Sequence, residues 1–235
     1  MSRLAGLRVL VTGAAGGIGG AVARRLEEDG AVVLRSDLGL EPPGLACDVA
    51  DEAAVLAMMG AAGPLWGVVH AAALCGGSGP FADVPSAVFR RYLDVNLLGA
   101  FHVLQAGARG MIAHGGGGRL VAIGSVNAVA AERHAGPYVA SKGGLRMLVK
   151  AAAVDLASHG IAASLVHPGP ILVERNAALF ATPEVAEGFA RAVPLPAPGP
   201  PEAVAEAVAY LMSPAATFTT GAEIAVDGGA LAFLP

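Results

Sequence analysis

The sequence predicts an α/β protein in which helices cover both faces of a doubly wound parallel sheet. Short apolar runs alternate along the chain with longer segments of helix-forming residues, which is the order that parallel β-α-β units require. A glycine-rich turn joins the first apolar run to the first helical segment, and an acidic residue follows the second run. These observations favour a single domain that spans residues 1–235.

The first element is a strand over 7–11, whose residues are mostly apolar. It enters the turn Thr12-Gly13-Ala14-Ala15-Gly16-Gly17-Ile18-Gly19, and a helix over 17–29 follows. Glycine permits a tight turn and a close approach of the backbone to a pyrophosphate, whose charge the free N–H groups of the new helix attract. A strand, a glycine turn and a helix in this order predict a dinucleotide-binding site.

A second strand over 31–35 ends near Asp37, which lies 24 residues after Gly13. A carboxylate at this distance can accept hydrogen bonds from the adenosine ribose and repels a 2′-phosphate, so the sequence favours NAD over NADP. Arg35 shares a face of the strand with Asp37, where it either serves a phosphate or pairs with that acid. Only ten residues separate Asp37 from Asp48, so we expect a truncated second crossover.

The remaining elements continue the alternation. The segment 114–118 is a loop by composition, and the proline-rich segment 194–201 is a stiff connector. No internal repeat and no linker divides the chain. We expect further strands over 44–46, 66–71, 119–124, 162–166 and 223–226, and further helices over 51–61, 85–113, 137–159, 183–191 and 201–212.

The most informative chemical pattern is Tyr138-Val-Ala-Ser-Lys142, with Ser125 placed 13 residues before the tyrosine. Residues four apart on a helix share a face, so the ammonium of Lys142 would stabilise the anion of Tyr138. This makes Tyr138 a suitable acid or base for moving a proton on an alcohol or carbonyl oxygen. Many helices carry such a pair without catalysis, and the glycine turn at the other end of the chain decides in favour of chemistry.

With these motifs the chain resembles the short-chain dehydrogenase/reductase (SDR) family over nearly its whole length. Thr12-Gly13-x-x-x-Gly17-x-Gly19 matches the family's cofactor turn, and Val226-Asp227-Gly228-Gly229 resembles its C-terminal signature. The resemblance implies a Rossmann-like fold. It also implies a homo-oligomer, either a dimer or a tetramer built through the helices at 85–113 and 137–159 and through the C-terminal strand.

The resemblance also implies a role for individual residues. Asn96, Ser125, Tyr138 and Lys142 match the catalytic tetrad of the family. In these roles Tyr138 exchanges the proton, Ser125 holds the substrate oxygen, Lys142 contacts the nicotinamide ribose, and Asn96 supports a water chain to solvent. The residues expected to contact NAD are Gly13, Gly17, Ile18, Gly19, Asp37, Asp48, Val49, Ala71, Ala72, Tyr138, Lys142, Pro168, Gly169 and Ile171.

Two of these residues have an ordinary structural explanation as well. An asparagine such as Asn96 in the middle of a helix can bend the helix by bonding to backbone carbonyls. Ser125 at the end of a strand can serve as a plain helix or turn cap. Both roles are compatible with catalysis, and the conjunction with Tyr138 favours the catalytic one.

The sequence departs from the family pattern at two places. His70-Ala71-Ala72-Ala73 replaces the family's Asn-Asn-Ala-Gly, which removes two amides that brace the fourth strand and turns a cofactor-facing glycine into alanine. Val173 stands where a threonine commonly contacts the nicotinamide carboxamide, so one hydrogen bond to the cofactor is missing or replaced.

Composition excludes several classes of protein. The chain is 54% hydrophobic, yet glycines, prolines and charges interrupt every apolar run before it reaches the roughly 18 residues of a membrane span. The N-terminal residues lead straight into the first strand and leave no room for a signal peptide, so we expect a cytoplasmic protein. A net charge of −4 with scattered basic residues argues against a nucleic-acid partner.

Cysteines and histidines show no metal-ligand spacing, so we expect no metal site. Cys47 and Cys75 lie far apart in the sequence, and we expect both to be reduced and without a special role. Among the six histidines, His134 lies between Ser125 and Tyr138 and could face a substrate, although a surface or core role fits an isolated histidine better.

The segment 171–200 lies where many SDR proteins carry a substrate lid. Its apolar residues offer a cover and its polar residues offer contacts, while an ordinary amphipathic surface helix explains the same residues equally well. The apolar side chains favour a small cyclic or aliphatic secondary alcohol over a phosphorylated or highly charged one.

The sequence therefore predicts an NAD(H)-dependent oxidoreductase that interconverts a secondary alcohol and a ketone. A catalytically silent NAD(H)-binding sensor on the same fold is the main alternative, which the altered residues 70–73 and Val173 allow and the intact tetrad opposes. Epimerase or dehydratase chemistry is a further alternative, but those relatives usually carry a larger C-terminal substrate domain.

Overall fold

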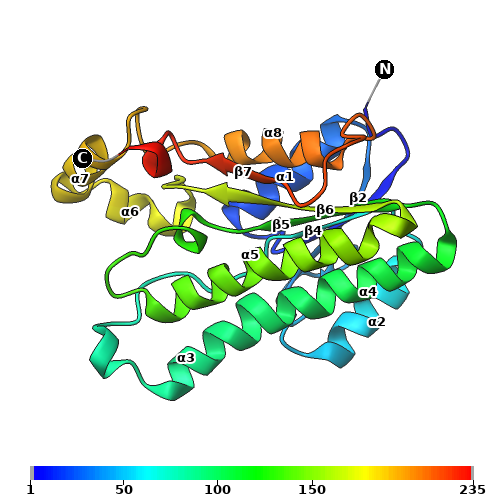
Figure 1. Cartoon of the computed structure of the whole chain (residues 1–235), viewed down its shortest axis with the longest axis horizontal. Coiled ribbons are helices and arrows are strands. Elements are labelled where there is room, and N and C mark those ends of the chain that lie inside the picture. The colour runs from blue at the N-terminus through cyan, green and yellow to red at the C-terminus, as the bar shows by residue number, and fades with distance from the viewer. Residues whose placement is uncertain (1–2, 234–235) are drawn as a thin grey trace.

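The structure, a computed structural model that describes residues 3–233, contains a seven-stranded parallel sheet (Figure 1). Its strand order is β3-β2-β1-β4-β5-β6-β7, and every neighbouring pair is parallel. The predicted doubly wound parallel sheet is therefore confirmed. The strands are β1 (Arg8–Thr12), β2 (Val32–Asp37), β3 (Leu45–Ala46), β4 (Gly67–His70), β5 (Gly118–Ile123), β6 (Ile161–Pro168) and β7 (Glu223–Val226).

Helices cover both faces of the sheet (Figure 1). One face carries α1 (Gly17–Glu28) and α8 (Pro201–Met212); the opposite face carries α2 (Glu52–Ala62), α4 (Gly99–His114) and α5 (Gly136–Leu156). Alternation along each strand divides the core, because successive side chains point to opposite faces. On β1, Val9 and Val11 join the α1 and α8 core, whereas Leu10 joins the core under α4 and α5.

The strand order reverses direction between β1 and β4. From β1 the chain moves outward to β2 and β3, then returns to β4 and continues outward on the other side to β7. Ligands of open α/β sheets bind beyond the carboxyl ends of the strands at such a reversal. The glycine turn after β1 and the loop after β4 both lie there.

The expected elements are confirmed to within a few residues, with two differences. As expected, β2 connects to β3 without an intervening helix. The single helix expected over 85–113 is instead α3 (Ser86–Leu93), a π-helical turn (Asp94–Leu98) and α4. The helix over 183–191 is α7 (Pro183–Ala192), and the short α6 (Ala177–Phe180) before it was not expected. Single 3-10 turns occupy Phe81–Asp83, Val126–Ala128, Ala157–His159, Glu174–Asn176 and Ala230–Ala232.

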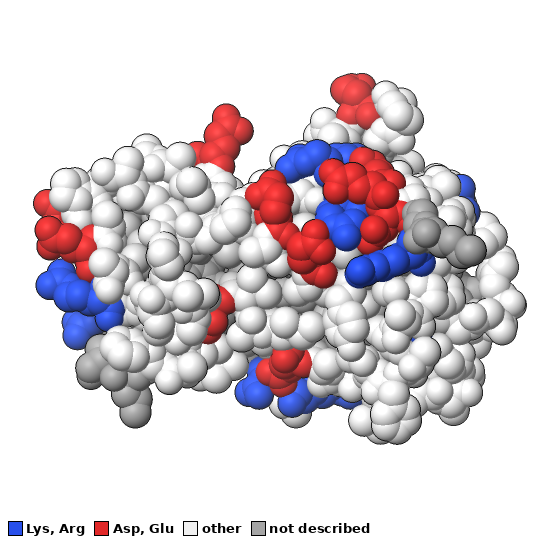
Figure 2. Space-filling model, turned by 90° about the horizontal axis from the view of Figure 1, so that it is seen from above, with Lys and Arg blue, Asp and Glu red and all other residues white. Residues whose placement is uncertain are grey.

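Ion pairs join α1 to α8 on the outer face of the sheet. Arg25 contacts Asp29 at 2.8 Å and Glu206 at 2.6 Å, and Arg24 contacts Glu202 at 3.6 Å. Figure 2 looks onto this face and shows charged side chains gathered over part of it, with large uncharged areas around them. Within residues 3–233, no helix is both long and apolar enough to cross a membrane.

Candidate active site

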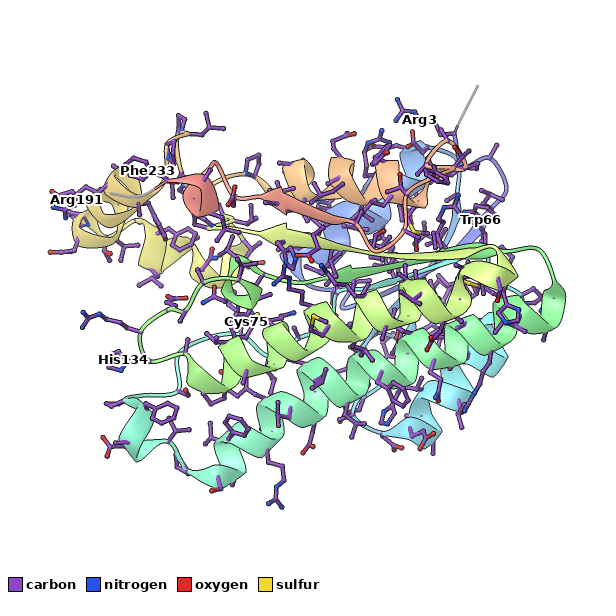
Figure 3. All side chains as sticks on the ribbon, in the orientation of Figure 1. Arg3, Trp66, Cys75, His134, Arg191 and Phe233 are labelled. Atoms are coloured by element: carbon purple, nitrogen blue, oxygen red, sulfur yellow. The ribbon has the colours of Figure 1, made fainter. Side chains whose placement is uncertain are left out.

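Three segments meet beyond the carboxyl ends of the central strands. The loop after β4 carries Cys75, the turn after β5 carries Ser125, and the first two turns of α5 carry Tyr138 and Lys142. Cys75 lies beside α5 at the end of the sheet near α6 (Figure 3). Parallel strands bring their carboxyl ends to one edge, which explains why segments so distant in the sequence converge.

Tyr138 and Lys142 lie on one face of α5, as their spacing predicts. The Nζ of Lys142 is 5.7 Å from the centroid of the Tyr138 ring. The same Nζ donates a hydrogen bond to the carbonyl oxygen of Ile123 at 2.8 Å, and the side chain is 3% exposed. The amine is therefore held in place by the end of β5 and stays close to the phenol.

Ser125 is a cap as well as a candidate catalytic residue. Its Oγ accepts a hydrogen bond from the N–H of Asn127 and donates one to Asn127 Oδ1, both at 3.1 Å. Asn127 in turn donates to a carboxylate oxygen of Glu132 at 3.2 Å. Capping fixes the position of the Ser125 hydroxyl, which lies close enough to the Tyr138 phenol to act on its pKa.

Asn96 lies in the π-helical turn and is almost fully buried. Its Oδ1 accepts from the N–H of Leu74 at 2.7 Å, and its Nδ2 donates to the Leu74 carbonyl at 2.9 Å and to Ser141 Oγ at 3.1 Å. Both side-chain donors are thus occupied by the protein. The side chain braces the loop after β4, and only one Oδ1 lone pair is left for the water chain that the family role requires.

The electrostatics of the site come mainly from burial. Burial raises the pKa of Tyr138, Cys75 acts in the same direction, and contact with Ser125 and the charge of Arg175 oppose the rise. Burial also lowers the pKa of Lys142 to about 8. Each shift favours the neutral form of the group that carries it.

Cys75 is a site residue that the sequence did not single out. Both cysteines are free, as expected, but the Cys75 thiol lies close enough to the Tyr138 phenol to help raise its pKa. Its place beside Tyr138 was not expected, because the turn of the loop after β4 toward α5 depends on Asn96, a contact that no local pattern encodes. The expectation that Cys75 has no special role stays a prediction.

His70 replaces the strand-bracing amide with an imidazole. Its Nδ1 lies 3.0 Å from Thr12 Oγ1, so the side chain still joins β4 to β1. Burial lowers the pKa of His70 to about 3, and the nearby charge of Lys142 acts in the same direction. The ring is therefore neutral at physiological pH. It braces β4 against β1, which is the role of the family's asparagine side chain at this place.

The glycine turn after β1 has the tight geometry expected of a pyrophosphate site. Gly13 has a φ of +69°, and a Cβ on it would lie 2.6 Å from backbone atoms of Ala71 and Ala72. A Cβ on Gly19 would meet the carbonyl oxygen of Gly13. Side chains are excluded here, and the N–H groups of the first turn of α1 have no intrahelical partner, so the turn fits a pyrophosphate.

Asp37 ends β2 and faces this turn. One of its carboxylate oxygens accepts a hydrogen bond from the N–H of Ala15 at 3.0 Å, and the other accepts from Leu38 at 2.8 Å. Arg35 points elsewhere and forms two hydrogen bonds with Glu27, at 3.1 and 2.8 Å. The expected pairing of Arg35 with Asp37 is wrong, because α1 presents a closer acid. The alternative role of Arg35 at a phosphate stays a prediction.

The other expected cofactor residues lie along the same edge. Asp48 is exposed, whereas the Val49 side chain is buried against Gly99, which leaves only the main chain of Val49 available to a ligand. Pro168 ends β6, and Gly169 packs so closely on Asp227 that a Cβ would overlap it. Ile171 is buried in the core under α1 and α8, so it supports the site from below.

Val173 takes a position that the sequence did not predict, whereas His134 takes the surface role that was favoured for it. The Val173 side chain packs against Gly17 at the start of α1, which brings the expected lid segment onto the glycine turn. His134 is exposed on the outer part of its loop, away from Cys75 (Figure 3). Its carbonyl oxygen accepts hydrogen bonds from the N–H and the hydroxyl of Ser78, so the residue joins two loops.

Comparison with known proteins places the chain in a family. A family model described as enoyl-(acyl carrier protein) reductase matches residues 13–230. L-rhamnose 1-dehydrogenase (NAD(P)+) from Sphingomonas sp. is 34% identical, over 97% of this chain and 98% of the relative. A short-chain type dehydrogenase/reductase from Mycobacterium ulcerans superposes with a TM-score of 0.91 at 33% identity, over 97% of this chain and 91% of that one. The chain is a short-chain dehydrogenase/reductase.

A further similar structure contains bound ligands. Gluconate 5-dehydrogenase from Burkholderia cenocepacia, in complex with NADP and tartrate, superposes with a TM-score of 0.93 at 31% identity. The match covers 99% of this chain and 98% of that one. Family membership supports an oxidoreductase that uses a nicotinamide cofactor.

Proposed function

We propose that this SDR is an NAD(H)-dependent enzyme that interconverts a small secondary alcohol and its ketone. The observation that carries the proposal is the convergence of Tyr138, Lys142 and Ser125 beyond the strand ends, beside the glycine turn. Neither half would suffice alone, because a Tyr-Lys pair or a glycine turn by itself is common. Together they supply a proton-transfer group next to a cradle for a dinucleotide.

NAD is the proposed cofactor because of the carboxylate of Asp37. It lies at the end of β2, hydrogen-bonded to the glycine turn, where it would meet the adenosine ribose. The negative charge of Asp37 would repel a 2′-phosphate. Arg35 is paired with Glu27 in this structure and does not offset that repulsion. The named relatives use NAD(P)+ or bind NADP, so the proposed preference rests on Asp37 of this chain and not on the relatives.

The chemistry follows from four side chains. The nicotinamide ring, when bound, supplies the group that accepts or gives the hydride. Ser125 holds the substrate oxygen, and Tyr138 exchanges a proton with it. The cation of Lys142 stabilises the anion of Tyr138, while Asn96 fixes the loop that borders the site.

Tyr138 is protonated at neutral pH, as an ordinary phenol is, and burial raises its pKa further. A protonated phenol is ready to give its proton to a ketone oxygen, so we propose that reduction is the favoured direction at neutral pH. Oxidation of the alcohol requires the anion first and is expected to gain as the pH rises.

The substrate we propose is a small polyhydroxylated or cyclic alcohol. Polar groups border the proton-transfer site, since Asn127 and Glu132 extend from Ser125 and Arg175 lies close enough to act on Tyr138. Two relatives, a rhamnose dehydrogenase and a gluconate dehydrogenase, are named for sugar-like substrates. These additional polar groups shift our expectation from a simple aliphatic alcohol toward one with several hydroxyls.

We further propose that the segment 171–200 closes over the substrate. It holds α6 and α7, whose rings Phe180 and Phe189 pack edge to face with centroids 4.9 Å apart. Contact of Val173 with Gly17 joins the start of this segment to the cofactor turn. Closure would exclude water during hydride transfer.

A homo-oligomer is also proposed, through the outer faces of α4 and α5. Large apolar side chains on these helices are exposed to solvent in the isolated chain, which is costly unless another surface covers them. Those residues are Phe101, Ile112, Met147 and Val154.

The decisive experiment measures turnover on a panel of ketoses, polyols and cyclic secondary alcohols, with NAD(H) and NADP(H) offered separately. Tyr138→Phe should abolish turnover and leave NADH affinity nearly unchanged, because the ring still packs while the proton-transfer group is gone. Retained activity in Tyr138→Phe would overturn the mechanism. Tight NADH binding without turnover on any substrate would instead favour a cofactor-binding sensor.

A further inference from the structure

A chain of buried polar contacts joins Ser125 to the neighbouring strands. The main-chain N–H of Ser125 donates a hydrogen bond to Nδ1 of His167 at 3.2 Å. The other ring nitrogen of His167, Nε2, lies 3.1 Å from Oε2 of Glu223. His167 is on β6 and is 2% exposed, and Glu223 begins β7, so the chain crosses three adjacent strands on the α5 side of the sheet.

The chain of contacts ends on the catalytic helix itself. Arg146 donates to Glu223 Oε2 at 2.7 Å, and Lys150 contacts Glu223 Oε1 at 2.5 Å. Tyr138, Lys142, Arg146 and Lys150 follow one another at four-residue steps on α5, so they form one ridge of the helix. The first half of this ridge carries the proton-transfer pair. The second half, Arg146 and Lys150, binds Glu223, which contacts His167.

The directions of these hydrogen bonds fix the tautomer of His167. A main-chain N–H can only donate, so Nδ1 is unprotonated and the ring proton is on Nε2, where it is donated to Glu223. Burial raises the pKa of Glu223, but hydrogen bonds from Arg146, Lys150 and His167 outweigh it and bring the pKa to about 2. The acid therefore stays charged and holds the imidazole in the orientation that Ser125 needs.

The main chain beside Ser125 is shaped to receive the imidazole. Gly124 lies directly under the ring, and a Cβ at this position would overlap Nδ1 and Cε1 of His167. The N–H of Gly124 bonds to the carbonyl oxygen of Val166 at 2.7 Å, which continues the β5–β6 pairing up to the ring. The absence of a side chain at 124 is what allows the ring to reach the N–H of the next residue.

We propose that His167 is a positioning residue, which fixes the main chain of Ser125 relative to Tyr138 and is itself oriented by Glu223, Arg146 and Lys150. The closed path from α5 through β7 and β6 to the turn after β5 sets the separation between the two groups that share the substrate oxygen. This inference rests on the proposed proton-transfer function of Ser125 and Tyr138.

Three substitutions of His167 separate its two contacts. In H167N the Oδ1 atom takes the place of Nδ1 and can still accept from Ser125, because both atoms are two bonds from Cβ. In H167Q the Nε2 atom takes the place of the imidazole Nε2 and can still donate to Glu223, while the contact with Ser125 is lost. H167L loses both contacts. V208A is a control, since this buried residue of α8 lies on the opposite face of the sheet and its truncation lowers stability without touching the site.

The first measurement is hydrogen exchange of the backbone amide of Ser125, which does not require turnover. We expect faster exchange in H167L and H167Q than in the wild-type protein, and wild-type protection in H167N. Equal protection in all three variants would overturn the proposed contact. This outcome is independent of the substrate panel, so it is distinct from a failure of the proposed function.

The second measurement is kcat and KM for the wild-type protein and the four variants, at a temperature below every unfolding transition. Loss of one positioning hydrogen bond is expected to lower kcat about tenfold in H167L and H167Q, with KM for NADH changed less than about twofold. H167N should recover most of this loss, and V208A should keep the wild-type kcat. A purely structural role predicts that kcat is unchanged in all His167 variants that remain folded, and that result would refute positioning. If the wild-type protein itself has no turnover, the proposed function fails, and the positioning claim fails with it.

Discussion

Asn96 holds the main chain of Leu74 from both sides, with its Oδ1 accepting from the N–H at 2.7 Å and its Nδ2 donating to the carbonyl at 2.9 Å. The asparagine is 1% exposed and lies in the π-helical turn between α3 and α4. Through this pair the helix fixes the loop that carries Cys75 to Tyr138. The site therefore depends on a residue that touches neither the phenol nor the glycine turn.

Replacing Asn96 with alanine should destabilise the protein. It removes three hydrogen bonds, leaves the half-buried N–H and carbonyl of Leu74 without their partner, and empties the space of a buried side chain, which is expected to cost about 2–4 kcal/mol. The free energy of unfolding in urea tests this. Asn176→Ala is the matched control, because Asn176 makes the same two kinds of main-chain bond, at 2.8 and 2.9 Å, but in the half-buried segment after β6. Equal losses in the two variants would contradict the argument.

Much of the fold was readable from the sequence because its signals are local. The alternation of apolar strands with helices, the glycine turn and the spacing of Tyr138 and Lys142 each depend on residues close together in the chain. The same locality explains the truncated crossover, since only ten residues separate Asp37 from Asp48. Each of these features follows from the geometry of one strand, one turn or one helix.

The features that escaped prediction depend on contacts between distant segments. Ser125 and His167 are 42 residues apart, and they meet only because β5 and β6 pair. Cys75 lies beside Tyr138 because Asn96 holds the loop that carries it. Arg35 pairs with Glu27 because α1 packs beside β2. Sequence patterns give the type of an element, whereas partner choice between elements requires the assembled sheet.

Gly19→Ala should weaken cofactor binding. A Cβ at this position would meet the carbonyl oxygen of Gly13, so the turn must open. Its N–H groups would then no longer point together at the pyrophosphate. We expect at least about a tenfold rise in the Kd for NADH, which corresponds to about 1.4 kcal/mol. Gly110→Ala on α4 is the control, because a Cβ there meets open space and should leave the Kd unchanged. Fluorescence titration with NADH measures both, and equal affinities would show that the turn tolerates a side chain.

Asp37→Asn should relax the choice between NAD and NADP. The amide can still accept a hydrogen bond from the N–H of Ala15, so the turn keeps its shape while the negative charge is removed. We expect the ratio of kcat/KM for NAD over that for NADP to fall about tenfold, since repulsion of the 2′-phosphate is lost. An unchanged ratio would mean that another part of the site sets the preference.

The pH dependence of ketone reduction should report Lys142. Burial lowers the pKa of Lys142 to about 8, so the cation that stabilises the Tyr138 anion is present below this pH and lost above it. Tyr138 stays protonated over the same range because burial raises its pKa. The rate should therefore be level from about pH 6 to pH 7 and fall through about pH 8, with no break near 6.5, since burial lowers the pKa of both His70 and His167.

Lys142→Arg provides the control for this profile. A guanidinium stays charged at every pH of the assay, so the fall above pH 8 should disappear even where the overall rate is lower. Initial rates of ketone reduction at saturating NADH, measured from pH 6 to pH 10, give the comparison. If the fall in rate near pH 8 persists in Lys142→Arg, it must be caused by the titration of another group. A break that is absent from the wild-type protein would show that Lys142 keeps its charge despite burial, and that its hydrogen bond to the Ile123 carbonyl outweighs the loss of hydration.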